Sequence, residues 1–224
     1  LLLSVRSGGK VSMPGMMDSI LNIGINDKNV DALASNFNDE RFALDSYRRL
    51  IQMYGNVVLE IEMDRFEAII DNKKRIDGVE NDNDFDSEQL SWIIDAFKTT
   101  VERFGGNPFP QDPIIQLKLS IKAVFKSWLN KRAVTYRKIN NIPNNLGTAT
   151  TVQSMVFGNL NESSGTGVAF TRFPSTGKNK LYGEYLMNAQ GEDVVAGIRT
   201  PYPIGKHEKN TQPSLEEENP ALFN

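Results

Sequence analysis

The chain has 224 residues, a formal net charge of −3 and 39% hydrophobic residues, which is enough to bury a sizeable core in one to three domains. Its sequence contains no run of about 18 apolar residues that could cross a membrane, and no clustered excess of lysine and arginine of the kind that binds nucleic acid. We therefore expect neither a nucleic acid nor a membrane as a partner.

The chain has no cysteine and a single histidine, His207. This composition excludes disulfides, thiolate metal sites, cysteine nucleophiles, Ser–His–acid triads and multi-histidine zinc sites built from this chain alone. Chemistry here must use arginine, lysine, carboxylates, backbone amides or a bound metal. The lack of cysteine also fits a reducing compartment, and we expect a cytoplasmic location.

The first residues, 1–6, predict a buried strand, and a loop rich in glycine, serine, methionine and proline follows at 7–15. The apolar segment 16–25 is interpreted as a short helix. The chain begins with three leucines and no initiator methionine, and residues 214–220 begin a helix at its end. We interpret both ends as cuts in a longer polypeptide.

From residue 27 to 106 the apolar spacing of three to four residues predicts helices. Asn38 or Asp39 is placed to cap the first long helix, and Asp64 opens a second with a pattern that resembles a capping box. Asp86 or Ser87 caps a third after a polar loop at 77–86. Its predicted inward stripe, which Gly105 and Gly106 terminate, is Leu90, Ile93, Ile94, Phe97, Val101 and Phe104.

Asp112 followed by Pro113 predicts the start of a further helix, which runs to Trp128, and a short helix is expected at 132–139. The composition then changes and predicts strands at 148–157, 168–172 and 181–186. Because the N-terminal strand needs partners, we expect residues 114–157 to return beside residues 1–25, with the helices between them as an insertion.

The segment SVRSGGKVSMPGMMD, residues 4–18, places Arg6 at the end of a buried strand before a glycine-rich loop. An arginine fork and closely approaching backbone amides can bind phosphate oxygens. The loop lacks the GxxxxGK[ST] pattern of a Walker-type site. The alternative is a strand–turn–helix connection with a solvent-facing arginine.

Three other segments carry weaker signals. The loop GNLNESSGTG at 158–167 lies between two strands and could cover a triphosphate, or be a flexible hairpin without a ligand. Glu192 and Asp193 lie beside a glycine and could position an arginine, a nucleotide or a metal, or form an ordinary surface turn. Arg49 follows Arg48 on a helix, where both could pair with nearby acids on the surface.

Together these segments resemble the N-terminal region of the pyruvate phosphate dikinase family, in order from Leu1 to about Pro203. The resemblance is carried by SVRSG, VSMPGMMD, ERFALDSYRRLIQMYGNVV, PFPQDP, AVFKSW, RAVTYRKINNIP, TATTVQSMVFGN, SGTGVAFTR, LYGEYL and NAQGEDVVAGIRTP. The strings VSMPGMMD and NAQGEDVVAGIRTP are the most specific.

This resemblance implies an α+β fold, namely an incomplete ATP-grasp fold with an all-helical insertion. Residues 1–25 and 112–157 would form the first α/β subdomain, 26–111 the insertion, and 158–224 the start of the second grasp subdomain. The family interconverts ATP, phosphate and pyruvate with AMP, pyrophosphate and phosphoenolpyruvate, and carries the phosphoryl group on a histidine of a swivelling domain.

The resemblance also implies which residues act. Arg6 matches a catalytic, phosphate-binding arginine of the family, Arg49 a second arginine of the nucleotide site, and residues 8–15 the glycine-rich loop. Gly9 and Lys10 depart from the small or apolar residues expected there. The implied ATP- and phosphate-binding positions are Arg6, Gly8, Gly15, Arg49, Thr166, Gly167, Glu192 and Asp193.

Other parts of the family's machinery are expected outside this sequence: a nucleotide-binding lysine, the acidic ligands of Mg²⁺, the phosphohistidine domain and the pyruvate-binding barrel. His207 does not match the phosphohistidine motif. The implied ligands are ATP and AMP, the parent is expected to be a homo-oligomer, and the 224 residues alone are expected to be inactive. Two alternatives stay open: a non-catalytic nucleotide-binding remnant, and the nucleotide domain of a water dikinase similar to phosphoenolpyruvate synthase.

Overall fold

The computed structural model describes residues 1–195, 200–206 and 213–223, except for the side chains of Glu192 and Val195. The predictions for the Glu192 side chain and for His207 therefore lie outside the described part. The chain divides into two compact units, Leu1–Met155 and Val156–Asn224. Each unit contains a small antiparallel sheet together with helices, which confirms the α+β class. Within the described ranges, no helix combines the length and the apolar character needed to cross a membrane.

The sheet of the first unit has β1 (Leu3–Ser7) at its centre, between β2 (Ser19–Ile23) and β3 (Thr150–Ser154). Both pairings are antiparallel, and Val5 faces Ile20 on one side and Val152 on the other. The N-terminal strand therefore finds a partner in the segment that returns after the helices, as predicted.

The predicted helix at 16–25 is wrong, because this segment contains the strand β2. Four of the five residues of β2 are buried, and α2 and α5 both pack on it. A strand that is covered on both faces carries a continuous apolar run, and its periodicity cannot be told from that of a buried helix. Residues 8–18 consequently form the loop of a β-hairpin and do not lead into a helix.

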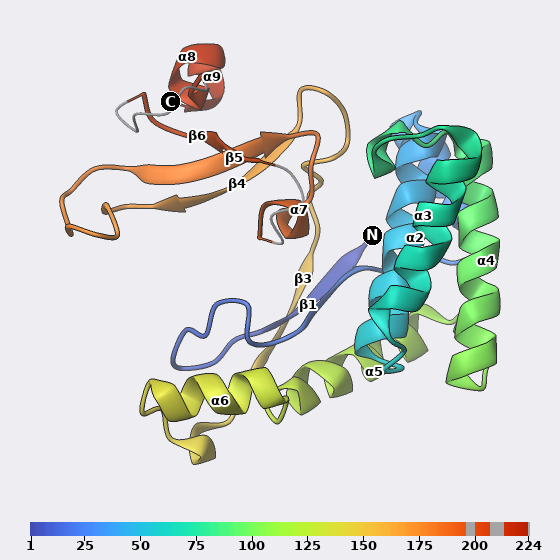
Figure 1. Ribbon diagram of the computed structural model, residues 1–224, viewed down its shortest axis with the longest axis horizontal. Helices are drawn as coiled ribbons and strands as arrows, with labels where there is room; N and C mark the ends of the chain where they lie inside the picture. Colours follow the sequence, from blue (N-terminus) through green and yellow to red (C-terminus); the bar gives the residue numbers. More distant parts are fainter. Residues whose placement is uncertain (196–199, 207–212, 224) are drawn as a thin grey trace. The chain divides into compact units, whose positions relative to one another are not determined.

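The helices of the first unit begin with α1 (Val30–Phe37), α2 (Glu40–Val57), α3 (Met63–Asp77) and α4 (Ser87–Gly105), with a 3₁₀ turn at Asp82–Asp84. Figure 1 shows α2, α3 and α4 side by side as a bundle. The predicted caps are confirmed at Asp39, which accepts from the amide of Phe42 at 2.8 Å, and at Asp86, which accepts from the amide of Gln89 at 2.8 Å. Gly106 ends α4 with φ of +78°.

Two details of the bundle differ from the prediction. The helix α3 begins after Glu62, which makes no side-chain cap, so the capping box at Asp64 is wrong. Phe104 is 43% exposed and lies outside the core. The guanidinium of Arg65 lies 3.9 Å from the centre of its ring, and this cation–π contact covers part of the aromatic face that the core does not bury.

Two further helices, α5 (Pro113–Ser127) and α6 (Lys131–Ile139), follow one another after the bundle, and a 3₁₀ turn at Asn144–Leu146 precedes β3 (Figure 1). Asp112 caps α5 by accepting from the amide of Ile114 at 2.7 Å, as predicted.

The buried stripe of α5 is polar or small, and Gln116 lies in it without solvent exposure. The Gln116 side chain accepts from the amide of Gly24 at 2.9 Å. It also donates to the carbonyls of Ile25 and Pro110 at 2.9 and 2.8 Å. Asn26 donates its side-chain amide to the carbonyl of Gln111 at 2.8 Å. The points where the chain enters and leaves the bundle therefore lie side by side.

The second unit contains a sheet in the order β4 (Gly165–Phe170), β5 (Tyr182–Met187), β6 (Tyr202–Pro203), with both pairings antiparallel. Short helices follow: α7 (Gly191–Val195), α8 (Leu215–Glu218) and α9 (Pro220–Phe223). Both predicted strands are confirmed, although β4 begins at Gly165 instead of residue 168. A Cβ on Gly183 would lie 2.2 Å from the carbonyl oxygen of Val168, so β4 and β5 approach closely where only glycine fits.

Candidate functional site

The predicted phosphate-binding arginine, Arg6, lies on the central strand β1 opposite Ser19 and Thr151. Its neighbour Val5 is fully buried, whereas Arg6 is exposed. Within the described part of the chain its side chain makes no hydrogen bond or ion pair. A rigid strand therefore presents a guanidinium whose donors are available to a ligand.

The loop that follows is fixed at its first residue. The amide of Gly8 donates to the carbonyl of Ala149 at 2.8 Å, and the amide of Ala149 donates back at 3.3 Å. These two bonds extend the ladder between β1 and β3 beyond Ser7. The loop therefore leaves the sheet from a defined point directly beside Arg6.

The centre of the loop contains a tight turn at residues 13–16. The amide of Met16 donates to the carbonyl of Met13 at 3.1 Å, and Gly15 has φ of +69°. Pro14 followed by a glycine of positive φ is the pattern of a type II turn. Met13 is buried and holds the turn to the unit. The structure thus gives Gly15 a role in shaping the loop.

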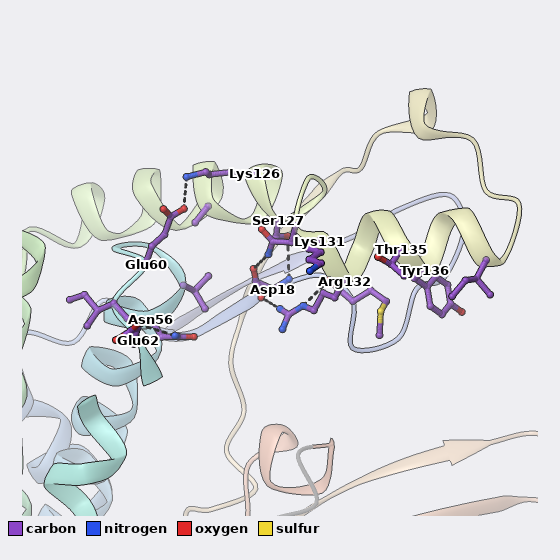
Figure 2. Close-up of a pocket in the computed structure, with 16 residues that line it drawn as sticks. Asp18, Asn56, Glu60, Glu62, Lys126, Ser127, Lys131, Arg132, Thr135 and Tyr136 are labelled. Carbon is purple, nitrogen blue, oxygen red and sulfur yellow. Dashed lines mark hydrogen bonds and ion pairs between the residues drawn. The ribbon is translucent and has the colours of Figure 1, made fainter. Parts of the chain in front are cut away.

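The end of the loop is fixed by Asp18, as Figure 2 shows. Its carboxylate forms an ion pair with Arg132 and accepts from the side-chain amide of Asn130 at 2.8 Å. Its own amide donates to the hydroxyl of Ser127 at 3.2 Å, and Nε of Arg132 donates to the carbonyl of Met16 at 3.2 Å.

The sequence analysis did not predict the anchoring role of Asp18. The sequence feature that could have indicated it is an acidic residue between the glycine-rich loop and an apolar segment. Asp18 ties the loop to the turn between α5 and α6, so the loop is held at both of its ends.

An open cleft of about 870 Å³ adjoins this anchor (Figure 2). Met16 and Asp18 reach it from the loop, whereas none of the sequence-predicted nucleotide residues lines it. Glu60 forms an ion pair with Lys126 at its edge, and the charged residues around it are of both signs. The cleft therefore borders the anchored end of the loop, but it is not the predicted nucleotide site.

The second predicted arginine, Arg49, lies on α2 and is 8% exposed. Its Nε donates to the carboxylate of Asp45 at 2.9 Å. Arg48 donates to the other oxygen of the same carboxylate, from Nε at 2.9 Å and from Nη2 at 2.7 Å. The acid pairing that the sequence suggested is present, but it is buried and does not lie on the helix surface.

The charge state of Asp45 follows from this arrangement. Burial alone would raise its pKa, but the charges of Arg49 and Arg48 and the hydrogen bonds of Arg48 hold the pKa well below its usual range. Asp45 is therefore an ionised group in the interior of the bundle.

In the second unit, Thr166 and Gly167 lie on β4, opposite Leu186 and Tyr185, so their prediction as loop residues is wrong. A Cβ on Gly167 would lie 2.7 Å from the carbonyl oxygen of Glu184, which restricts this position to glycine. The hydroxyl of Thr166 lies 4.0 Å from the position that a Cβ on Gly191 would take. The structure thus brings Thr166 to the start of α7.

The two predicted acids belong to α7. The backbone of Glu192 is part of this helix, but its side chain lies outside the described part of the chain. Asp193 is buried, and its carboxylate accepts from the amide of Gln190 at 2.8 Å. This bond fixes the turn into α7. The described side chains include no group of three or more histidines, cysteines and acids placed to hold a metal ion.

Residues 1–219 match the sequence model of the family described as "Pyruvate phosphate dikinase, AMP/ATP-binding domain". The chain is 53% identical to "Pyruvate, phosphate dikinase" of Rhizobium meliloti (strain 1021), over 100% of this chain and 25% of that protein. It is 56% identical to the protein of that name from Clostridium symbiosum, over 94% of this chain and 24% of the relative. It is 55% identical to "Pyruvate, phosphate dikinase 1, chloroplastic" of Oryza sativa subsp. japonica, over 90% of this chain and 21% of that protein. The chain spans about a quarter of the length of these curated relatives.

Proposed function

Because the chain belongs to the pyruvate phosphate dikinase AMP/ATP-binding domain family, we propose that it binds ATP as the nucleotide-binding part of a pyruvate phosphate dikinase. The observation that carries this proposal is the match over residues 1–219 together with relatives of that name at more than 50% identity. In the proposed reaction, ATP, phosphate and pyruvate are interconverted with AMP, pyrophosphate and phosphoenolpyruvate. A histidine on another domain of the same polypeptide carries the phosphoryl group.

In this proposal Arg6 and the amides of residues 8–15 bind the phosphates of ATP. The transfer places negative charge on phosphate oxygens, and fixed donors stabilise that charge best when they need no rearrangement. Arg6 lies exposed on a rigid strand, and the loop beside it is anchored at Gly8 and Asp18. This preorganisation supports the assignment of Arg6 as a catalytic residue.

The remaining site residues are assigned within the same proposal. Arg49 would supply a second guanidinium from α2. Thr166 and Gly167 would approach the phosphates from β4, and Glu192 and Asp193 would act from α7 beside Thr166. The proximity of Thr166 to Gly191 supports placing the last four in one group.

We further propose that the fold is an ATP-grasp fold in which residues 1–25 and 112–157 form one subdomain. Residues 26–111 would be its helical insertion, and 158–224 would begin the second subdomain. The division into units near residue 155, and the adjacent ends of the helical block at Asn26 and Gln111, support this arrangement. The ligands of Mg²⁺ are proposed to lie outside this sequence, and no step is assigned to a metal held by the described residues.

The test uses the full-length polypeptide that contains this chain. Incubation with β-labelled ATP and phosphate should yield AMP, pyrophosphate and a labelled phosphohistidine, and calorimetric titration should detect ATP binding. Phosphate dependence should distinguish the dikinase from a water dikinase, because only the dikinase consumes phosphate as a co-substrate. The absence of ATP binding, or full turnover without phosphate, would contradict the proposal.

A further inference from the structure

The strand β3 places Thr151 directly beside Arg6 on the sheet of the first unit. The two residues are cross-strand partners in the antiparallel pair of β1 and β3 (Figure 1). The side chains of directly opposite residues lie on the same face of a sheet, with their Cβ atoms about 5 Å apart. Arg6 and Thr151 are both exposed, so this face offers a guanidinium and a hydroxyl side by side.

The hydroxyl of Thr151 lies against the first residue of the glycine-rich loop. A Cβ on Gly8 would lie 3.3 Å from Oγ1 of Thr151, which is closer than ordinary van der Waals contact. Gly8 and Ala149 exchange two backbone hydrogen bonds, so the geometry of the sheet continues to Gly8. Since Gly8 lies two residues after Arg6, it shares a face with Arg6 and Thr151. The lack of a side chain at Gly8 leaves the hydroxyl open towards the loop.

The groups around this hydroxyl are hydrogen-bond donors whose partners are not found in the described part of the chain. Neither the side chain of Arg6 nor that of Thr151 makes a hydrogen bond to a described residue. The amides of Gly9 and Lys10 also donate to no described group. A hydroxyl can donate or accept, but a guanidinium and backbone amides only donate, so a ligand shared by these groups must be an acceptor. A phosphate group has several acceptor oxygens and the negative charge that matches the guanidinium.

We propose that Thr151 is a further phosphate-binding residue, whose hydroxyl donates to a phosphate oxygen of ATP between Arg6 and the start of the loop; this rests on the proposed function of Arg6 and the loop. The hydroxyl of Thr151 is carried on a short side chain, so it binds an oxygen close to the sheet. The longer side chain of Arg6 reaches further from the strand, so the two groups bind different oxygens of the same ligand. Thr151 transfers no proton in this proposal.

The preceding residue of the same strand provides a matched control. Thr150 is paired with Ser7, and because side chains alternate along a strand, it lies on the face opposite to that of Arg6 and Thr151. The hydroxyl of Thr150 is buried and has no hydrogen-bond partner among the described residues. Replacement of either threonine by valine keeps the β-branched shape that suits a strand and removes only the hydroxyl. The two valine variants therefore differ in the face of the sheet that loses a hydroxyl.

The experiment measures dissociation constants by calorimetry on the full-length polypeptide. The ligand is ATP with a methylene group in place of the α,β-bridging oxygen, so binding is measured without transfer of the β- and γ-phosphates. We expect Thr151→Val to weaken binding at least about tenfold, as the loss of a hydrogen bond to a charged acceptor does. Thr151→Ser keeps the hydroxyl and should bind within about threefold of the wild type. Thr150→Val should bind like the wild type.

Arg6→Ala in the same assay separates this inference from the proposed function. No binding by the wild type, or unchanged binding in Arg6→Ala, contradicts the proposed function on which the inference rests. Weak binding in Arg6→Ala with wild-type binding in Thr151→Val overturns the inference alone. An equal loss in Thr151→Ser or in Thr150→Val also overturns it, because a disturbed strand, and not the missing hydroxyl, would then weaken binding.

Thr151→Ala keeps the proposal testable if Thr151→Val does not fold. It removes the hydroxyl from an exposed position without adding a group, so we expect the same loss of affinity as in Thr151→Val. Phosphorylation of the carrier histidine by phosphoenolpyruvate should be unchanged. Wild-type affinity for the ATP analogue in Thr151→Ala would overturn the inference.

Discussion

Asp18 forms an ion pair with Arg132, and the same guanidinium donates from Nε to the backbone oxygen of Met16 at 3.2 Å. A single side chain of α6 thus holds both the last residue of the hairpin loop and the backbone two positions before it. Met16 also closes the type II turn of the loop, so the anchor fixes that turn as well. The conformation of the loop beside Arg6 depends on a helix that is remote in sequence.

Removal of this anchor should loosen the loop. We expect Asp18→Ala to increase the rate at which trypsin cleaves after the exposed Lys10, and to lower the free energy of unfolding by about 1 kcal/mol, because Arg132 is half exposed and the pair is partly screened. Cleavage is followed by mass spectrometry of the full-length polypeptide. Asp31→Ala, at an exposed position of α1, is the control. Equal cleavage rates in Asp18→Ala and in the wild type would contradict the anchoring role.

Arg6→Ala should abolish the ATP-dependent phosphorylation of the carrier histidine and leave its phosphorylation by phosphoenolpyruvate intact. The free energy of unfolding should change by less than about 0.5 kcal/mol, because Arg6 is exposed and its side chain has no partner within the described residues. The two half-reactions are measured separately, with Lys138→Ala on the exposed side of α6 as a charge-matched control. A wild-type rate of ATP-dependent phosphorylation in Arg6→Ala would show that Arg6 does not bind the transferred phosphates.

Two buried tyrosines of α2 should respond in opposite ways to loss of the hydroxyl. The hydroxyl of Tyr54 is buried and has no hydrogen-bond partner among the described residues, and burial raises its pKa to about 12. Tyr47 donates to Asp27 at 2.7 Å and accepts from Gln111 at 3.3 Å. We expect Tyr54→Phe to be neutral or to stabilise by up to about 1 kcal/mol, and Tyr47→Phe to destabilise by about 1–2 kcal/mol.

Urea unfolding of the two tyrosine variants at neutral pH measures this difference. A destabilised Tyr54→Phe would reveal a partner for that hydroxyl, such as a buried water.

Acid should lower the free energy of unfolding, because it protonates the buried Asp45. Its pKa is held well below the usual value in the folded protein, whereas the unfolded chain takes up the proton near pH 4. The contribution of the ionised Asp45 to the free energy of unfolding is therefore complete above about pH 4, and it is lost as the pH falls towards the folded-state pKa. Unfolding free energies measured between neutral and acid pH should fall less steeply in Asp45→Asn than in the wild type, because asparagine does not titrate. Identical slopes would show that Asp45 is not the titrating group.

Local signals in the sequence predicted much of the first unit. Asp39, Asp86 and Asp112 each precede an apolar-periodic segment, and each caps a helix, because the preference of a short acid for the first free amides needs no tertiary context. The strand at the N-terminus and its return partner also followed from local apolar content and from the need of a strand for hydrogen bonds.

Features that depend on packing were not predictable in this way. The apolar segment that contains β2 predicts a helix, because four of the five residues of β2 are buried and a continuous apolar run does not distinguish a buried strand from a buried helix. Phe104 fits the apolar period of α4, but Arg65 covers it and the core does not. The sequence shows Asp18 and Asp45 as acids. It does not show that Asp18 meets Arg132, which lies 114 residues further along the chain, or that Asp45 and Arg49 are buried when the bundle packs.

The adjacent ends of the helical block have a consequence for changes of chain length. The chain enters the helical bundle near Ile25 and leaves it at Pro110, and hydrogen bonds of Gln111 and Gln116 hold these two points together. Both glutamines lie outside the bundle, so the positions of these two points do not depend on the number of residues between them. Changes in the length of the bundle loops should therefore leave the strand register of β1 with β2 and β3 unchanged. The exposed turn after Gly78, where φ is +71°, is for the same reason a suitable place to insert a reporter peptide or an affinity tag.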